Sequence, residues 1–166
     1  LAALFKEMHP GWSPMAIKSA LMTSAGDILD GPNTSILTIF KQGAGHIRPN
    51  SAADPGLVYD SNLYDWFAFL CGATNGVGAG TCAFLESLGY SLDPSDLNQA
   101  SIAIGDLPGT QTIKRRLTNV SGKRLTVNAN VTGMGGFTTV ISPASLTLAP
   151  GGTGDFTVTF TRTTAT

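Results

Sequence analysis

Residues 125–131 read LTVNANV and residues 156–160 read FTVTF, so apolar and polar side chains alternate through both stretches. This two-residue period is typical of a β-strand with one buried face. Similar short runs follow residue 98, and turn signals rich in Gly, Pro and Ser separate them, which favours a β-sandwich. The expected strands are 102–104, 113–120, 125–131, 137–141, 146–148 and 156–160.

The first 98 residues have a helical pattern instead. Ser13-Pro14 is a typical helix start, because Ser caps the first turn and Pro suits the first helical position, and Gly26 is expected to end this helix. Residues 36–40 predict a short strand. Two more helices are expected from apolar residues at helical spacing, namely Leu1, Leu4, Phe5 and Met8, and then Leu63, Trp66, Phe67 and Leu70 within residues 60–71.

The composition limits the possible functions. Among 166 residues there are ten Lys and Arg against eleven Asp and Glu, with a pI near 6.1, so no nucleic-acid partner is expected. No apolar run reaches the roughly 20 residues that a membrane-spanning helix needs, so no membrane contact is expected either. The two cysteines are too few for a structural zinc site, but a bridge between Cys71 and Cys82 would close a Gly-rich loop and stabilise the fold by about 3 kcal/mol.

The residues alone assemble no active site. His9 precedes a Pro at a helix end, where a capping or surface role is expected. His46, in Gly-Ala-Gly-His, has no Ser or Cys in a strained Gly-flanked turn beside it. Residues 43–45 lack the further Gly and the Lys of a phosphate loop. Most of the Asp side chains neighbour Gly or Pro and are expected to form turns, although the sequence leaves a calcium site open.

Two other surface features stand out. Lys114, Arg115 and Arg116 form the one basic cluster together with Lys123 and Arg124 across an expected turn, and a solvated strand face is a better interpretation of it than a ligand site. Asn33, Asn119 and Asn130 fit the acceptor pattern for N-glycosylation, which matters only in a secreted eukaryotic protein.

Residues 9–25, HPGWSPMAIKSALMTSA, closely resemble a segment of the subtilisin-like serine proteases, in the branch typified by the plant cucumisin-like enzymes. The stretches FKQGAGHIRPN at 40–50 and ADPGLVYD at 53–60 are similar to the next two signatures of that family, in the same order. Residues 64–71 resemble its Cys-containing segment, and residues 97–104 resemble the opening of its fibronectin III-like domain.

This resemblance implies an α+β fragment: residues 1–60 end an α/β peptidase domain, residues 61–97 form a helical connector with the disulfide Cys71–Cys82, and residues 98–166 form an all-β fibronectin III-like sandwich without its last strand. The implied parent is a secreted serine endopeptidase whose Ser, His and Asp triad precedes Leu1. No catalytic, cofactor-binding or metal-binding residue is therefore assigned here. Protein or peptide substrates would bind the absent part.

Two alternatives stay open on the sequence. Instead of the tail of an active protease, the chain could be a non-enzymatic binding module built on the sandwich, or the tail of a degenerate pseudoprotease. An upstream Gly-Thr-Ser nucleophile motif would favour the protease, and its absence would favour the module. The apolar faces of the first two helices are also expected to be partly uncovered.

Overall fold

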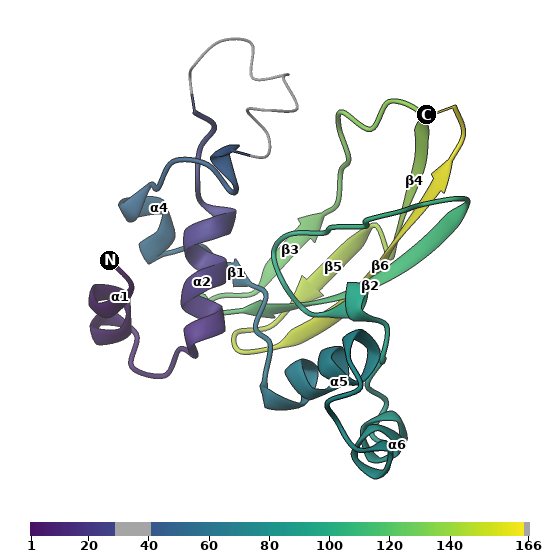
Figure 1. Cartoon of the computed structure of the whole chain (residues 1–166). Coiled ribbons are helices and arrows are strands. Elements are labelled where there is room, and N and C mark those ends of the chain that lie inside the picture. Colours follow the sequence, from purple (N-terminus) through teal and green to yellow (C-terminus); the bar gives the residue numbers. More distant parts are fainter. Residues whose placement is uncertain (29–40, 165–166) are drawn as a thin grey trace.

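The computed structural model describes residues 1–28 and 41–164 and has the mixed α and β composition predicted from the sequence. In Figure 1 the first helices lie on one side, the strands form a sandwich on the other side, and a pair of helices lies beneath the sandwich. The strand expected at 36–40 falls outside the described residues.

The helix α2 (Pro14–Thr23) begins as predicted, because the Ser13 hydroxyl accepts a hydrogen bond from the Ala16 amide at 2.9 Å. It ends at Thr23, before Gly26, where the hydroxyls of Thr23 and Ser24 donate back to main-chain carbonyls of the preceding turn. Gly26 instead forms an isolated antiparallel bridge with His46. The prediction that Gly26 ends this helix was therefore wrong.

The short helices α1 (Ala2–Met8) and α4 (Pro49–Ala53) pack against α2. Phe5, Ile17 and Ala52 form their shared buried cluster. The other members of the α1 apolar stripe, Leu1, Leu4 and Met8, are about half exposed. Helix α1 therefore leaves much of its apolar face in contact with solvent.

The helices α5 (Leu63–Ala73) and α6 (Ala79–Ser87) form the pair beneath the sandwich. A disulfide between Cys71 and Cys82 joins them, with the two Cα atoms 5.8 Å apart. The sequence suggested an unstructured loop between these cysteines, but irregular backbone is confined to residues 74–78. Helix α6 forms despite Gly78 and Gly80 at its start because Ala83, Leu85 and Glu86 favour helix and Leu85 is buried.

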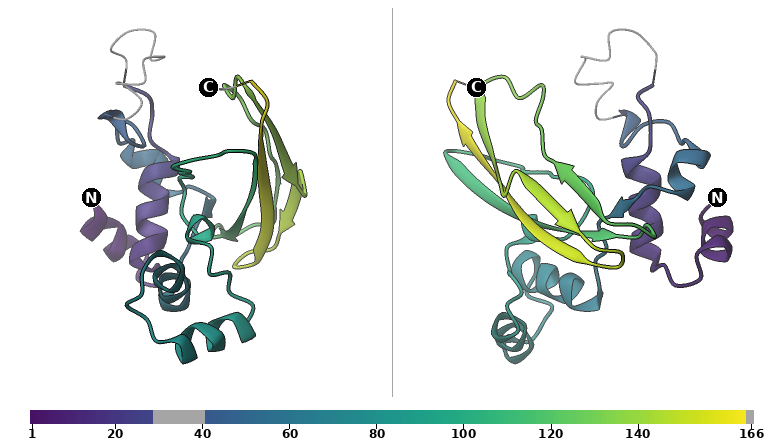
Figure 2. Two further views of the ribbon diagram at one scale, coloured as in Figure 1. Left: turned by 45° about the vertical axis from the view of Figure 1, so that its right-hand side comes forward. Right: turned by 180° about the vertical axis from the view of Figure 1, so that it is seen from behind.

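The strands form two antiparallel sheets, with the order β1-β2-β6-β4 in the larger and β3-β5 in the smaller. Figure 2 shows the twist of the larger sheet. Ile113 of β2 lies opposite Val158 of β6, and Ile141 of β4 faces the same valine. The strands are β1 (Leu57–Val58), β2 (Thr110–Asn119), β3 (Leu125–Asn128), β4 (Phe137–Ser142), β5 (Ser145–Leu148) and β6 (Thr153–Arg162).

The core of the larger sheet consists of Ile113, Val158 and Phe160. Ile104 and Leu107 pack on this cluster from an irregular segment. The strand expected at 102–104 is absent: these residues are irregular, Ile104 packs on the sheet with its side chain, and Ile102 is exposed. The strand expected at 125–131 is also shorter, ending at Asn128.

The first helices and the sandwich share a core. Val58, with 0% of its surface exposed, packs with Ala16 and Ala20 of α2 and with Val120 after β2. Strand β1 also extends the larger sheet, with Leu57 opposite Asn119. The three-part division at residues 60 and 97 stays a prediction, but one sheet joins the first part, through β1, to the third part, through β2. Within the described residues, no helix combines the length and apolar character needed to cross a bilayer.

We expect Val58→Asp to destabilise the protein by about 3 kcal/mol or more, because the carboxylate would be buried among apolar side chains without a partner. The matched control is Val140→Asp on β4, where the valine is 56% exposed. Urea unfolding followed by circular dichroism measures both changes. Equal losses of unfolding free energy in the two variants would contradict the burial of Val58 between α2 and the sandwich.

Replacing both Cys71 and Cys82 by Ser should lower the free energy of unfolding by about 3 kcal/mol, since the bridge restricts the unfolded chain. The effect should concentrate in α6, whose buried anchor in this structure is Leu85. In the double variant, the rate of amide hydrogen exchange should rise more at residues 79–87 than in β2 or β6, relative to the wild type. Unchanged protection of α6 in the double variant would argue against this.

Candidate functional site

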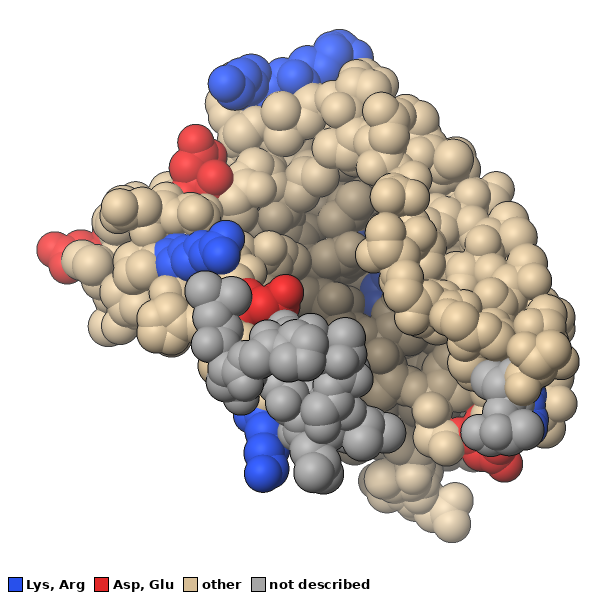
Figure 3. Space-filling model, turned by 90° about the horizontal axis from the view of Figure 1, so that it is seen from above, with Lys and Arg blue, Asp and Glu red and all other residues tan. Residues whose placement is uncertain are grey.

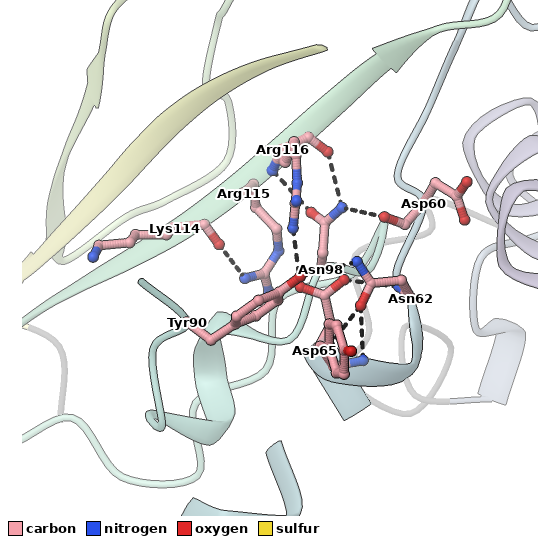
Figure 4. Close-up of polar contacts among 9 residues, drawn as sticks. Asp60, Asn62, Asp65, Tyr90, Asn98, Lys114, Arg115 and Arg116 are labelled. Atoms are coloured by element: carbon pink, nitrogen blue, oxygen red, sulfur yellow. Dashed lines mark hydrogen bonds and ion pairs between the residues drawn. The ribbon is translucent and has the colours of Figure 1, made fainter. Parts of the chain in front are cut away.

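A cluster of hydrogen-bonded polar side chains lies where α5, the 3₁₀ helix η1 (Pro94–Asp96) and strand β2 meet. We call it the arginine joint and define it as Asp65, Asn98, Arg115 and Arg116, which Figure 4 shows converging from these elements. Each member is held by hydrogen bonds within the chain.

Asn98 is buried and takes the place of a neighbouring strand for β2. Its amide group donates to the main-chain carbonyls of Asp60 and Arg116, at 3.1 and 3.0 Å, and its side-chain oxygen accepts from the Arg116 amide at 2.9 Å. One side chain therefore ties the segment after β1 to the middle of β2.

Arg115 is only 5% exposed and has its guanidinium turned into the protein. It donates to the main-chain carbonyls of Ser95, Gln99, Ser101 and Lys114 at 2.7–3.1 Å. Burial lowers the pKa of Arg115, while Asp96 and Tyr59 raise it in part. The solvated face expected for the basic cluster was therefore wrong at Arg115, which fastens residues 95–101 onto β2.

Arg116 makes an ion pair with Asp65 at 2.9 Å. The other carboxylate oxygen of Asp65 accepts from the Asn62 amide at 2.8 Å, which completes a reciprocal cap at the start of α5. The side chain of Asn62 in turn donates to the Tyr90 hydroxyl at 3.1 Å. The ion pair thus fixes the first turn of α5 to β2.

Tyr59 lies next to this joint, between α2 and the sandwich. Its ring lies 6.5 Å from that of Phe156 on β6, and its main-chain amide donates to the Ser19 hydroxyl of α2 at 2.8 Å. Burial raises the pKa of the Tyr59 phenol, and the positive charge of Arg115 lowers it in part.

Two clefts flank Tyr59 and the joint. The first, of about 540 Å³, has three cationic and four acidic side chains in its wall: Lys114, Arg115, Arg116, Asp65, Asp93, Asp96 and Asp155. The second, of about 730 Å³, runs between α2 and the sandwich and is lined mainly by apolar groups, among them Leu57, Leu117, Ile141 and Leu146. Figure 3 shows, from above, the hollow between the helical part of the chain and the sandwich.

The two histidines lie apart from this joint. The His9 ring stacks on Trp12 with centroids 3.9 Å apart, and its Nε2 atom lies 2.9 Å from the Ala53 carbonyl oxygen. His46 is bridged to Gly26 through its main chain, and Gly45 allows this approach, because a Cβ there would lie 2.3 Å from the Gly26 oxygen. Within residues 1–28 and 41–164, no histidine ring is hydrogen-bonded to a hydroxyl or a carboxylate.

The arrangement therefore holds elements together. In the described part of the chain, Ser13 and Ser95 donate to the carboxylates of Asp60 and Asp93, but no histidine ring joins these contacts. Sequence reasoning missed the arginine joint. The Asn62-x-x-Asp65 pattern is a readable capping signal. The burial of Arg115 has no such signal, since three of its four carbonyl partners are 14 to 20 residues away.

Comparison with known proteins agrees with these features. Residues 96–166 match the family model described as a fibronectin type-III domain. The chain is 38% identical over 97% of its length to the subtilisin-like protease SBT2.5 of Arabidopsis thaliana, and 36% identical over 88% of its length to the subtilisin-like protease SBT3 of Solanum lycopersicum. It spans only 22% and 21% of these relatives.

These matches confirm the resemblance to subtilisin-like proteases and the α+β fold with a fibronectin III-like part. The chain spans about a fifth of each relative's length, so these matches do not show that it has the proteolytic activity of those proteins.

The raised pKa of Tyr59 predicts a pH effect on stability. The folded protein holds the phenolic proton more tightly than the unfolded chain does, so this contribution is complete below the ordinary pKa of 10.0 and is lost as pH rises through the raised value. Between about pH 9 and about pH 11, the wild type should lose more stability than Tyr59→Phe in urea unfolding. Parallel pH profiles for the two proteins would refute the shift.

Proposed function

We propose that these residues belong to a secreted subtilisin-like serine endopeptidase, in which they brace the catalytic part and supply none of its reacting groups. The observation that carries the proposal is the similarity to subtilisin-like proteases over 97% of the chain. In such an enzyme a Ser attacks the peptide carbonyl, a His accepts and returns the proton, and an Asp orients the His. Protein or peptide substrates would bind outside the present residues.

The bracing role is supported by the contacts of α2. Beyond its apolar contact with Val58, three side chains of this helix and its cap bond to residues that lead into the sandwich: Ser13 donates to the Asp60 carboxylate, Ser19 accepts from Tyr59, and Lys18 donates to Gln99. Helix α2 is thus fixed on one side by the sandwich. We infer that its opposite side faces the helix carrying the nucleophile.

Secretion is supported by the disulfide between Cys71 and Cys82, because such bridges persist mainly in oxidising compartments. The relatives are plant proteins named as subtilisin-like proteases, and the proposal extends that activity to the protein containing this chain.

A serine-directed fluorophosphonate probe tests the proposal on the complete gene product. We expect one covalent label on a Ser outside residues 1–166, together with hydrolysis of a denatured protein substrate. The 166-residue chain alone is expected to stay unlabelled. A complete product that takes up no probe and cleaves no peptide would favour a binding module or a pseudoprotease. A label on a Ser within the chain would contradict the bracing role.

A further inference from the structure

We propose that Asn130 carries an N-linked glycan and that Asn119, which has the same acceptor pattern, carries none. The inference rests on the proposed secretion, because the modifying enzyme acts on exported chains. The structure separates the two sites by their surroundings, although their sequences, Asn119-Val-Ser and Asn130-Val-Thr, are nearly identical.

Asn119 is 0% exposed and ends β2. Its side-chain nitrogen donates to the carbonyls of Lys123 and Leu148, at 2.8 and 3.0 Å, and its side-chain oxygen accepts from both the amide and the hydroxyl of Ser121. Both amide hydrogens are thus used, and the side chain lies between the ends of β2 and β5. A sugar on this nitrogen would replace one donor and displace the strands around it.

Asn130 has the opposite environment. It lies in irregular backbone after β3, and Asn130, Val131 and Thr132 are all exposed. The Asn130 side chain stands at the wall of the apolar cleft between α2 and the sandwich. A glycan here reaches solvent without breaking a strand, as surface loops allow.

The chemical step needs a lipid-linked diphosphate oligosaccharide as co-reactant. The Asn130 nitrogen forms a bond to the anomeric carbon of the first sugar and loses one proton, while the bond from that carbon to the diphosphate breaks and the lipid diphosphate leaves. Nothing is oxidised or reduced. The hydroxyl at the third position of the pattern, Thr132, is required for acceptance, whereas the chain keeps the same backbone without it.

A glycan at this place also has a physical use. Val131 and Met134 are 37% and 38% exposed in the same loop. The attached sugar would cover these apolar side chains and the nearby mouth of the cleft. Exposed apolar surface of this kind promotes association in a protein that lacks such a cover.

The experiment expresses the complete gene product in a eukaryotic secretory host and maps it by mass spectrometry before and after treatment with an amidase that removes N-glycans and leaves an aspartate behind. In the secreted protein, the peptide with Asn130 should show the mass of this Asn-to-Asp conversion only after the treatment, and the peptide with Asn119 should be unmodified throughout. An unmodified Asn130, or an occupied Asn119 in the secreted folded protein, would overturn the proposal.

Matched variants isolate the site, in a background of Asn33→Gln because Asn33 lies outside the described residues. Thr132→Ala should remove one glycan step in gel mobility, whereas Thr132→Ser should keep it because Ser preserves the acceptor pattern. Asn128→Gln, at an exposed Asn without the pattern, should change nothing. Equal mobility of the Ala and Ser variants would overturn the assignment.

The two proposals can fail separately. If the natural product is not exported, the proposed secretion fails. Translation into microsomes with a foreign signal peptide then still decides whether Asn130 accepts a glycan. If the product is exported and labelled by the serine probe but Asn130 is bare, only the present inference fails.

Discussion

The buried guanidinium of Arg115 fixes the segment before β2 onto the larger sheet, and no carboxylate among the described residues is bonded to it. Arg115 bonds to carbonyls from residues 95–101, a stretch that has almost no regular secondary structure of its own. Carbonyl groups taken out of water must find donors, and a single planar cation with several N–H groups satisfies a number of them at once. The chain leaving α6 can therefore lie flat on β2, where Ile104 and Leu107 then cover the sheet. Such apolar contacts supply most of the favourable energy, whereas the polar ones fix orientation because their geometry is directional.

Sequence reasoning succeeded where the signal was local. The start of α2 could be read from Ser13 and Pro14, and β6 could be read from the strict alternation at 156–160. It failed where distant contacts decide the outcome. Residues 102–104 look like a strand, but they are irregular and Ile104 covers the sheet. The stretch between Cys71 and Cys82 looks like a loop, but its last residues begin α6, which the bridge to Cys71 and the buried Leu85 hold in place.

The candidate site shows the same difference between features with a local sequence signal and features set by distant contacts. The capping residues Asn62 and Asp65 have a readable spacing, while the buried state of Arg115 and of Asn119 depends in part on partners as far as 20 and 29 residues away. The three glycosylation acceptor patterns all fit Asn-x-Ser/Thr, so the sequence alone does not say which of them is accessible in the folded protein. Solvent access distinguishes Asn119 from Asn130, and it is a property of the folded chain alone.

The two residues of β1 have a consequence for how such proteins evolve. Leu57 and Val58 complete the larger sheet of the sandwich. The sandwich is therefore not an independent domain that gene shuffling could move without the residues before it. Residues 98–166 moved alone would leave the edge of β2 at residues 118–119 unpaired and would expose Val120, which Val58 contacts here. An unpaired strand edge promotes strand pairing between molecules. We therefore expect the sandwich and the preceding helices to be inherited together as one unit.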